Sequence, residues 1–215
     1  LLPESVELYQ NLSAALLEQG KAKESAAILE KKALYEKIIV LRGQINLEPR
    51  NHHHHQALAE TLTKLEKYPE AAAAYRQGIE LEKDRTWWLQ GSLGDCLVKT
   101  GKYAEAETAY RQSFEIDRHK SLWLYSGLAK ALYKQGELER AIDTYQQAIA
   151  VDPENAEVWS GKGFAHMSLQ QPEQALESFE RAQEIKPDEP SFWLQKGIVL
   201  GALQRPQEAN QFYQE

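Results

Sequence analysis

The chain has 215 residues, of which 42% are hydrophobic and 27% are charged, a composition typical of globular proteins that bury a core. Its formal net charge of −7 disfavours nucleic acid as the main partner, because phosphate binding requires clustered basic side chains. No apolar run approaches the ~20 residues that a membrane-spanning helix needs, so no membrane insertion is expected. The single cysteine, Cys96, excludes an intramolecular disulfide.

Residues 1–50 predict a first helical repeat that starts at a capping residue, Ser5, and has an unusually long second helix over residues 23–46. The apolar side chains of this helix form a stripe at helical spacing: Ile28, Leu34, Ile38, Leu41 and Ile45. A neighbouring repeat is too narrow to cover the whole stripe. The sequence therefore predicts that residues 28–45 pack on another chain, by self-association through the long helix, or on an upstream segment. Because the chain starts without methionine and stops inside its last repeat, we expect it to be part of a longer protein.

Four consecutive histidines, His52 to His55, follow the predicted helix cap Asn51. His52 and His55 lie three residues apart, so they share a helix face and form a candidate pair of zinc or nickel ligands. One helical turn cannot supply four ligands, however, and no carboxylate or thiol is placed nearby in the sequence. The favoured interpretation is that His55 fills a half-buried packing position, that the other histidines lie at the surface, and that there is no metal site.

From here to the end, the sequence repeats itself. An alanine recurs at steps of 35, 35, 34 and 34 residues, and an aromatic residue follows each alanine four positions later. The alanines are Ala71, Ala106, Ala141, Ala175 and Ala209, and the aromatics are Tyr75, Tyr110, Tyr145, Phe179 and Tyr213. Capping residues keep the same step, at Asn51, Thr86, Ser121, Asn155 and Glu189 before Pro190. Breaks at Gly101 and Gly136, or at Pro69, Pro172 and Pro206, split each repeat into two amphipathic helices, with turns near 66–69, 100–103, 135–138, 170–172 and 204–206.

These residues resemble the signature of the tetratricopeptide repeat family. One repeat carries it as Trp159, Gly163, Ala175, Phe179, Ala182 and Pro187. The resemblance implies an all-α, right-handed α-solenoid, with an elongated repeat at 1–50, full repeats at 51–85, 86–120, 121–154 and 155–188, and a partial one at 189–215. It also implies that small residues let the two helices of a repeat approach closely, at Gly94, Ala129, Gly163 and Gly197.

In this family the first helices line a concave groove that holds peptides or partner helices. The groove residues that this resemblance selects are two tryptophans, a tyrosine and four lysines: Trp88, Trp123, Tyr133, Lys64, Lys99, Lys130 and Lys134. Basic charge beside tryptophan predicts a protein or peptide partner that is acidic and carries apolar anchors. The competing interpretation is that the lysines only complement the helix dipoles and that the tryptophans pack between repeats.

No catalytic constellation and no cofactor-binding motif is found in the sequence. Cys96 lies beside Leu97 in a first helix and is interpreted as a small packing residue. The leading functional hypothesis is therefore a non-catalytic interaction scaffold that binds a partner in the groove. The alternative is the regulatory or substrate-docking arm of a larger enzyme such as a glycosyltransferase. RNA binding by a pentatricopeptide-like array is a third hypothesis, disfavoured by the acidic charge and by the return to steps of 34 residues.

Overall fold

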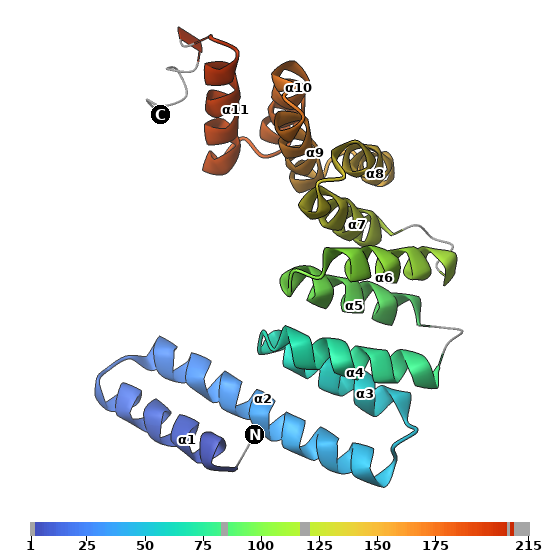
Figure 1. Cartoon of the computed structure of the whole chain (residues 1–215). Helices are drawn as coiled ribbons and strands as arrows, with labels where there is room; N and C mark the ends of the chain where they lie inside the picture. The colour runs from blue at the N-terminus through green and yellow to red at the C-terminus, as the bar shows by residue number, and fades with distance from the viewer. Residues whose placement is uncertain (1–2, 83–85, 117–120, 206, 209–215) are drawn as a thin grey trace. The chain divides into compact units, whose positions relative to one another are not determined.

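A computed structural model describes residues 3–82, 86–116, 121–205 and 207–208. These described residues form eleven α-helices and no strand (Figure 1). The prediction of an all-α fold is confirmed. Within the same ranges, no helix combines the length and the apolarity that crossing a membrane requires. The predicted packing residues Ala209 and Tyr213, and Pro206, lie outside the described residues.

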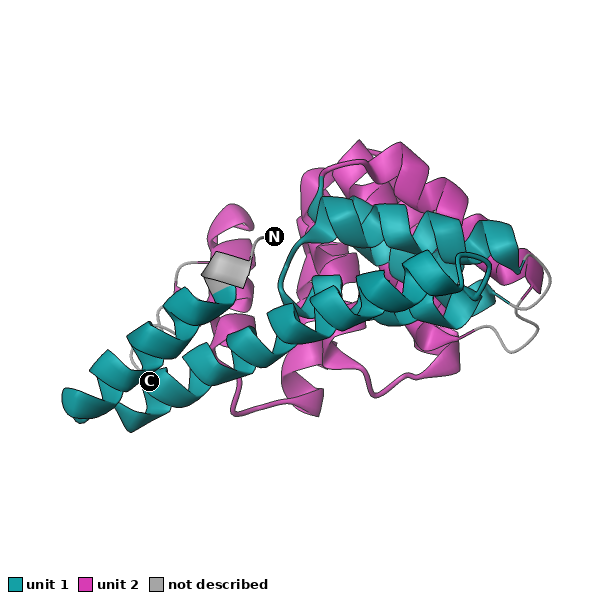
Figure 2. Cartoon of the chain, turned by 90° about the horizontal axis from the view of Figure 1, so that it is seen from below, with its two compact units in different colours: residues 1–100 teal, residues 101–215 magenta. Residues whose placement is uncertain are grey.

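The chain divides into two compact units (Figure 2). Unit 1 is Leu1–Thr100 and unit 2 is Gly101–Glu215. The helices of unit 1 are α1 (Pro3–Glu18), α2 (Ala22–Leu47), α3 (His52–Lys64), α4 (Tyr68–Leu81) and α5 (Trp87–Lys99). Those of unit 2 are α6 (Tyr103–Ile116), α7 (Leu122–Gln135), α8 (Leu138–Val151), α9 (Ala156–Ser168), α10 (Pro172–Ile185) and α11 (Pro190–Ala202). Within each unit, every helix packs against the next one along the chain.

Three of the predicted helix caps act as expected, and one of them, Glu189, accepts a hydrogen bond from the backbone N–H of Ser191 at 3.5 Å. The side chains of Asn51 and Asn155 accept hydrogen bonds from the backbone N–H groups of His53 and Val158, at 3.2 Å in both cases. Thr86 and Ser121 directly precede their helices, but their side chains make no capping hydrogen bond to the described residues. The prediction of Ser5 as a cap is wrong, because α1 already begins at Pro3.

The turns between paired helices share one backbone conformation that the sequence pattern only partly revealed. The residue seven positions after the small packing residue has a positive φ in every described repeat: Gly20, Glu66, Gly101, Gly136, Gln170 and Gln204. Glycine adopts this left-handed conformation without a steric penalty, as at Gly136 with φ 84°. Since non-glycine residues occupy three of these places, the fold imposes the turn even where the local sequence does not favour it.

The repeated alanines and aromatics form the core, as predicted. The four described alanines of the series, at 71, 106, 141 and 175, are each 0% exposed, and their aromatic partners are at most 6% exposed. The rings of Tyr110 and Tyr145 lie directly on glycines of the next helix, Gly127 and Gly161. A Cβ atom at Gly161 would lie 2.6 Å from Cζ of Tyr145. The ring thus occupies the space that any larger residue needs, and only glycine fits without a shift.

The long helix is confirmed as α2, which has 26 residues, but its predicted exposure is wrong. Ile38 is 0% exposed and Leu41 is 6% exposed, and the rest of the stripe is half-buried. The reason is that α2 packs against α1 on one side and α3 on the other, so two helices share the stripe. The exposed apolar side chains of α2 are different ones: Leu29, Ile39, Val40 and Leu47.

One carboxylate connects three helices of unit 2. Glu107 on α6 accepts hydrogen bonds from Gln135 at 3.0 Å, from Arg111 at 3.0 Å and from Arg140 of α8. Burial alone favours the neutral acid, but these donors favour the charged form and hold the pKa of Glu107 below its usual value. Its side chain is only 16% exposed, so solvent weakens this network less than it weakens surface ion pairs.

We predict that Ala141→Phe lowers the free energy of unfolding by roughly 1–3 kcal/mol, because the side chain is fully buried and extra volume forces its neighbours to move. Chemical denaturation followed by circular dichroism measures this change. Ala150→Phe on the exposed face of the same helix is the control and should have little effect. Equal stability of the two variants would contradict the packing described here.

A second pair of variants tests the contact between ring and glycine. Gly161→Ala should destabilise the chain despite the higher helix propensity of alanine, since the new methyl group overlaps the Tyr145 ring. Gly43→Ala in α2 has no neighbouring atom within 4 Å and should stabilise it by roughly 0.5–1 kcal/mol. Opposite signs in thermal denaturation are expected, and stabilisation by both changes would refute the argument.

The Glu107 network predicts a pH dependence. The folded state lowers the pKa of this carboxyl, so its contribution to stability is complete above the ordinary glutamate pKa of 4.5 and is lost as the pH falls through the lower folded value. The difference in unfolding free energy between the native chain and Glu107→Gln should therefore shrink on acidification. A difference that stays constant from neutral pH down to acid pH would argue against this network.

Candidate functional site

The histidine run does not converge on one point. Nε2 of His52 lies 2.5 Å from Oε2 of Glu82, at the end of α4, whereas Nε2 of His55 lies 3.1 Å from the backbone oxygen of Pro49. The described residues contain no group of three or more histidine, cysteine or acidic side chains that could hold a metal ion. The sequence did not reveal that Glu82 reaches the run, because this glutamate is distant along the chain.

The role of His55 follows from two tryptophans at equivalent positions. Nε1 of Trp159 donates to the carbonyl of Pro153 at 2.8 Å, and Nε1 of Trp193 donates to that of Pro187 at 2.7 Å. In each case the ring nitrogen contacts the carbonyl oxygen of the proline six residues earlier, and Nε2 of His55 makes the same contact with Pro49. The histidine is 9% exposed, and it substitutes for the larger ring as a buried packing residue, as predicted.

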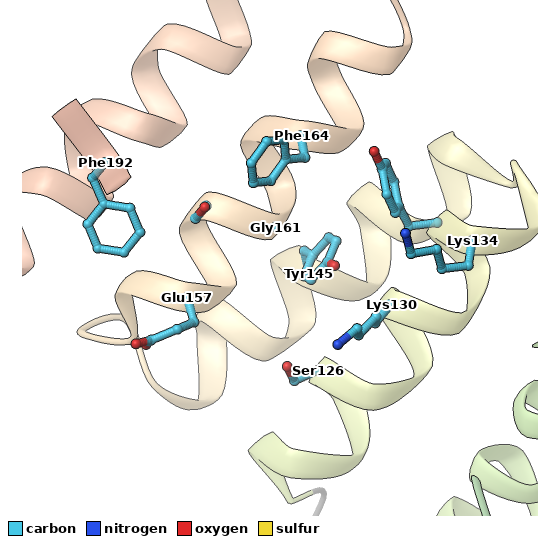
Figure 3. Close-up of a pocket in the computed structure, with 10 residues that line it drawn as sticks. Ser126, Lys130, Lys134, Tyr145, Glu157, Gly161, Phe164 and Phe192 are labelled. Carbon is cyan, nitrogen blue, oxygen red and sulfur yellow. The ribbon is translucent and has the colours of Figure 1, made fainter. Parts of the chain in front are cut away.

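A cavity of about 320 Å³ lies in unit 2 against α7 and α9 (Figure 3). Three of the predicted groove residues line it, and all three come from α7: Lys130, Tyr133 and Lys134. The opposite wall is formed by Glu157, Ser160, Gly161 and Phe164 of α9, with Phe192 of α11 at one end and Tyr145 of α8 in the floor. The cavity is thus basic on the α7 side, whereas the α9 side combines Glu157 and Ser160 with the ring of Phe164.

The floor of the cavity is closely packed and uncharged. Tyr145 packs on Gly161 and is 6% exposed, and burial together with the nearby Tyr133 raises the pKa of Tyr145 to about 12. The hydroxyl of Tyr133 lies 3.3 Å from that of Ser168. The hydroxyl of Ser160 donates to Gln195 at 2.8 Å, which fixes the wall relative to α11.

Lys130 and Lys134 differ from most other cations of unit 2. Arg111 and Arg140 pair with Glu107, Arg181 with Glu154 and Glu184, Lys186 with Glu157, and Lys196 with Glu180. Neither Lys130 nor Lys134 forms an ion pair with any acidic group in the described part of the chain. Nζ of Lys134 lies 5.7 Å from the centroid of the Tyr133 ring instead. The one carboxylate in the cavity wall, Glu157, is held by Lys186 at 2.5 Å.

Exposed apolar side chains recur from Phe164 in the cavity wall to the equivalent repeat positions of α11. Phe164 is 43% exposed, and Leu194 and Ile198 are each 54% exposed. Ile198 occupies the place of Phe164 one repeat of 34 residues later, and Leu194 occupies that of Ser160. We call Lys130, Lys134, Phe164, Leu194 and Ile198 the basic–apolar surface.

Sequence reasoning missed these three apolar residues because it extended the groove only through α7. The recurring lysines end on α7, at Lys134. The same repeat positions on α9 and α11 select Phe164, Leu194 and Ile198.

Trp123 lies on the same face of α7, seven residues before Lys130, and is 37% exposed. It does not line the cavity. Three other predicted groove residues belong to unit 1: Lys64, Trp88 and Lys99. Lys64 and Lys99 are exposed, and Nζ of Lys99 lies 5.9 Å from the centroid of the Tyr68 ring. One groove that unites the residues of both units stays a prediction.

Trp88 is less available than predicted. It is half-buried, and its ring meets that of Trp87 edge-on with centroids 5.9 Å apart. Cys96 is 1% exposed, its Sγ lies 3.6 Å from the hydroxyl of Thr63, and burial raises the pKa of its thiol. Its interpretation as a packing residue is confirmed, because a buried neutral thiol is a poor nucleophile.

Comparison with known protein structures supports the fold. MamA matches with a TM-score of 0.69 and 20% identity over 76% of this chain and 88% of that one. PilW, a widely conserved type IV pilus biogenesis factor, matches with a TM-score of 0.70 and 15% identity over 98% and 91%. YrrB, described as a TPR protein with an unusual peptide-binding site, matches with a TM-score of 0.65 and 17% identity over 80% and 88%. At these identities the likeness shows the fold alone, an α-solenoid of helix–turn–helix repeats.

Comparison with curated protein sequences gives no significant match. Comparison with sequence families gives three matches: a tetratricopeptide repeat profile over residues 57–117, a TPR repeat profile over 129–170 and a second tetratricopeptide repeat profile over 156–189. Together they cover more than half of the chain, over the residues whose helix pairs, buried alanines and packed aromatic rings are described above. The chain therefore belongs to the tetratricopeptide repeat family.

Proposed function

We propose that this chain is a non-catalytic interaction scaffold and that the basic–apolar surface of unit 2 binds a protein segment carrying acidic residues and apolar anchors. The observation that carries the proposal is the pair Lys130 and Lys134. In a chain with a net charge of −7, these two lysines line a cavity without a carboxylate partner among the described residues. An acidic partner would supply the missing countercharge.

The apolar half of the surface supports the same partner chemistry. Phe164 lines the cavity and is exposed, and Leu194 and Ile198 expose apolar area at the equivalent places of α11, where leucine or aromatic side chains of a partner can be desolvated. The buried, neutral floor of Tyr145 on Gly161 is already packed, so little ordering is needed on binding. The description of YrrB as having a peptide-binding site adds support at the level of the fold.

Other parts of the functional prediction remain proposals. Trp123 extends the surface toward the start of α7, and Lys64, Trp88 and Lys99 would contribute if both units bind one partner. The repeat boundaries at 51, 86, 121, 155 and 189 stay a prediction. So do self-association through α2 and the role of a docking arm in a larger enzyme, and no contact described above favours the enzyme alternative.

The proposal predicts selective peptide binding. A fluorescein-labelled peptide with leucines flanked by glutamates should bind the chain, and its counterpart with lysines in place of the glutamates should not. Phe164→Ala and Trp123→Ala should each weaken binding by about 2 kcal/mol, as the loss of a buried aromatic anchor typically does. Fluorescence anisotropy measures both effects.

Charge and location are tested with two further variants. Lys134→Glu should weaken binding at low ionic strength and lose most of this effect at high salt. Glu177→Ala, on the exposed face of α10, is the matched control and should leave binding unchanged. Binding that depends on Glu177 and not on Phe164 or Lys134 would place the ligand elsewhere.

A further inference from the structure

Helix α1 has an exposed apolar ridge. Leu8 is 67% exposed and Leu12, one turn later, is 47% exposed, with the exposed Ala15 continuing the line. Glu7 and Glu18 lie on one flank of this ridge, and neither pairs with a cation among the described residues. The helix contains no basic residue at all. It is therefore an acidic helix whose apolar side chains face solvent.

The repeat explains why this ridge is open. Ser13 of α1 is 3% exposed and corresponds to the small packing residues Gly94 and Ala129. The turn residue with positive φ identifies this correspondence, since it follows seven positions later in each repeat. By this alignment Leu8, Leu12 and Ala15 correspond to Leu89, Leu93 and Cys96 of α5, and to Leu124, Leu128 and Ala131 of α7.

Those six residues are at most 6% exposed, because the preceding helix covers them, α4 on α5 and α6 on α7. One contact shows this directly. Leu89 lies 3.5 Å from the Cβ position of Gly78 on α4. No such helix covers the ridge of α1 in the described structure, so the ridge presents the side chains of a repeat interface without its partner helix.

Charge limits what can cover the ridge. A symmetric pairing of two α1 helices would bring Glu7 and Glu18 of two copies together with no basic residue on α1 itself to offset them. The basic–apolar surface of unit 2 has the opposite charge, because it carries two lysines that have no carboxylate partner among the described residues, together with exposed apolar side chains. The two surfaces have opposite charges, and both expose apolar side chains, so they are complementary.

We propose that α1 of one copy binds the basic–apolar surface of a second copy. The inference rests on the proposed function and names the partner as another molecule of the same chain. The two surfaces are different patches, so the contact is heterologous, and each copy keeps one free surface of each kind. Association therefore continues head to tail and depends on protein concentration.

Two double variants of the whole chain test this. The ridge variant is Leu8→Gln with Leu12→Gln, and the surface variant is Lys130→Glu with Lys134→Glu. All four side chains are exposed, so both proteins should retain the native circular dichroism spectrum and melting temperature. In sedimentation velocity at increasing concentration, the native chain should form dimers and larger species. Each variant alone should associate at least roughly tenfold more weakly than the native chain.

Mixing the two variants is the decisive measurement. The ridge variant keeps an intact surface and the surface variant keeps an intact ridge, so an equimolar mixture should form a one-to-one complex. A monomeric native chain would overturn the inference. Undiminished association of the surface variant would also overturn it, since that result indicates a symmetric α1 contact, and so would a mixture that stays monomeric.

The acidic leucine peptide separates this inference from the proposed function. It should bind the ridge variant as tightly as the native chain and should dissociate native assemblies. If the peptide binds but the native chain stays monomeric, the surface takes a different acidic partner and only the self-association is wrong. If the peptide does not bind either, the proposed function fails as well.

Discussion

The contact between a ring and the helix next to it is the constraint on which the rest of the structure depends. A single helix pair of this size cannot bury its own apolar side, so each pair is stable only when a neighbouring helix covers it. Tyr110 and Tyr145 fill the space between repeats, and Gly127 and Gly161 leave the room that they need. The fully buried alanines of the second helices allow the same close approach.

This packing also decides where function can lie. Core positions are filled by side chains that only stabilise, so the side chains left for a partner are those that the repeat does not require, such as Lys130, Phe164 and Ile198. Most other cations of unit 2 satisfy carboxylates on neighbouring helices. Two lysines that line a cavity and lack a carboxylate partner within the described ranges are therefore a departure from the pattern, and such departures indicate recognition better than fold membership does.

Covered and uncovered faces also differ between α1 and the later first helices. The leucines of α5 and α7 that correspond to Leu8 and Leu12 are buried by the preceding helix. In the described structure Leu8 and Leu12 are exposed, and acidic residues flank them. The array thus carries an unsatisfied repeat interface of defined charge, together with a surface of opposite charge in unit 2.

Much of the fold could be read from the sequence because its signals are local and repeated. The steps of 34 and 35 residues, the caps Asn51 and Asn155 and the buried Ala141 were all predicted, since each depends on helical periodicity or on a short-range hydrogen bond. The exposure of the α2 stripe was predicted wrongly. Burial of Ile38 requires both α1 and α3, and a helical pattern does not tell how many neighbours a face will have.

The candidate site shows the same division. Lys130, Tyr133 and Lys134 were identified from the resemblance to the family's groove positions, and residues three or four apart lie on one side of α7. Among the described residues, the two lysines lack a carboxylate partner, whereas Glu157 already pairs with Lys186. This difference depends on which helices lie close enough for their side chains to meet. By itself, the sequence determined the helices, their period and the residue types on each face, because these follow from local backbone geometry. Only the tertiary structure decided which faces are covered and which charges are neutralised, because burial and ion pairing depend on contacts between residues distant along the chain.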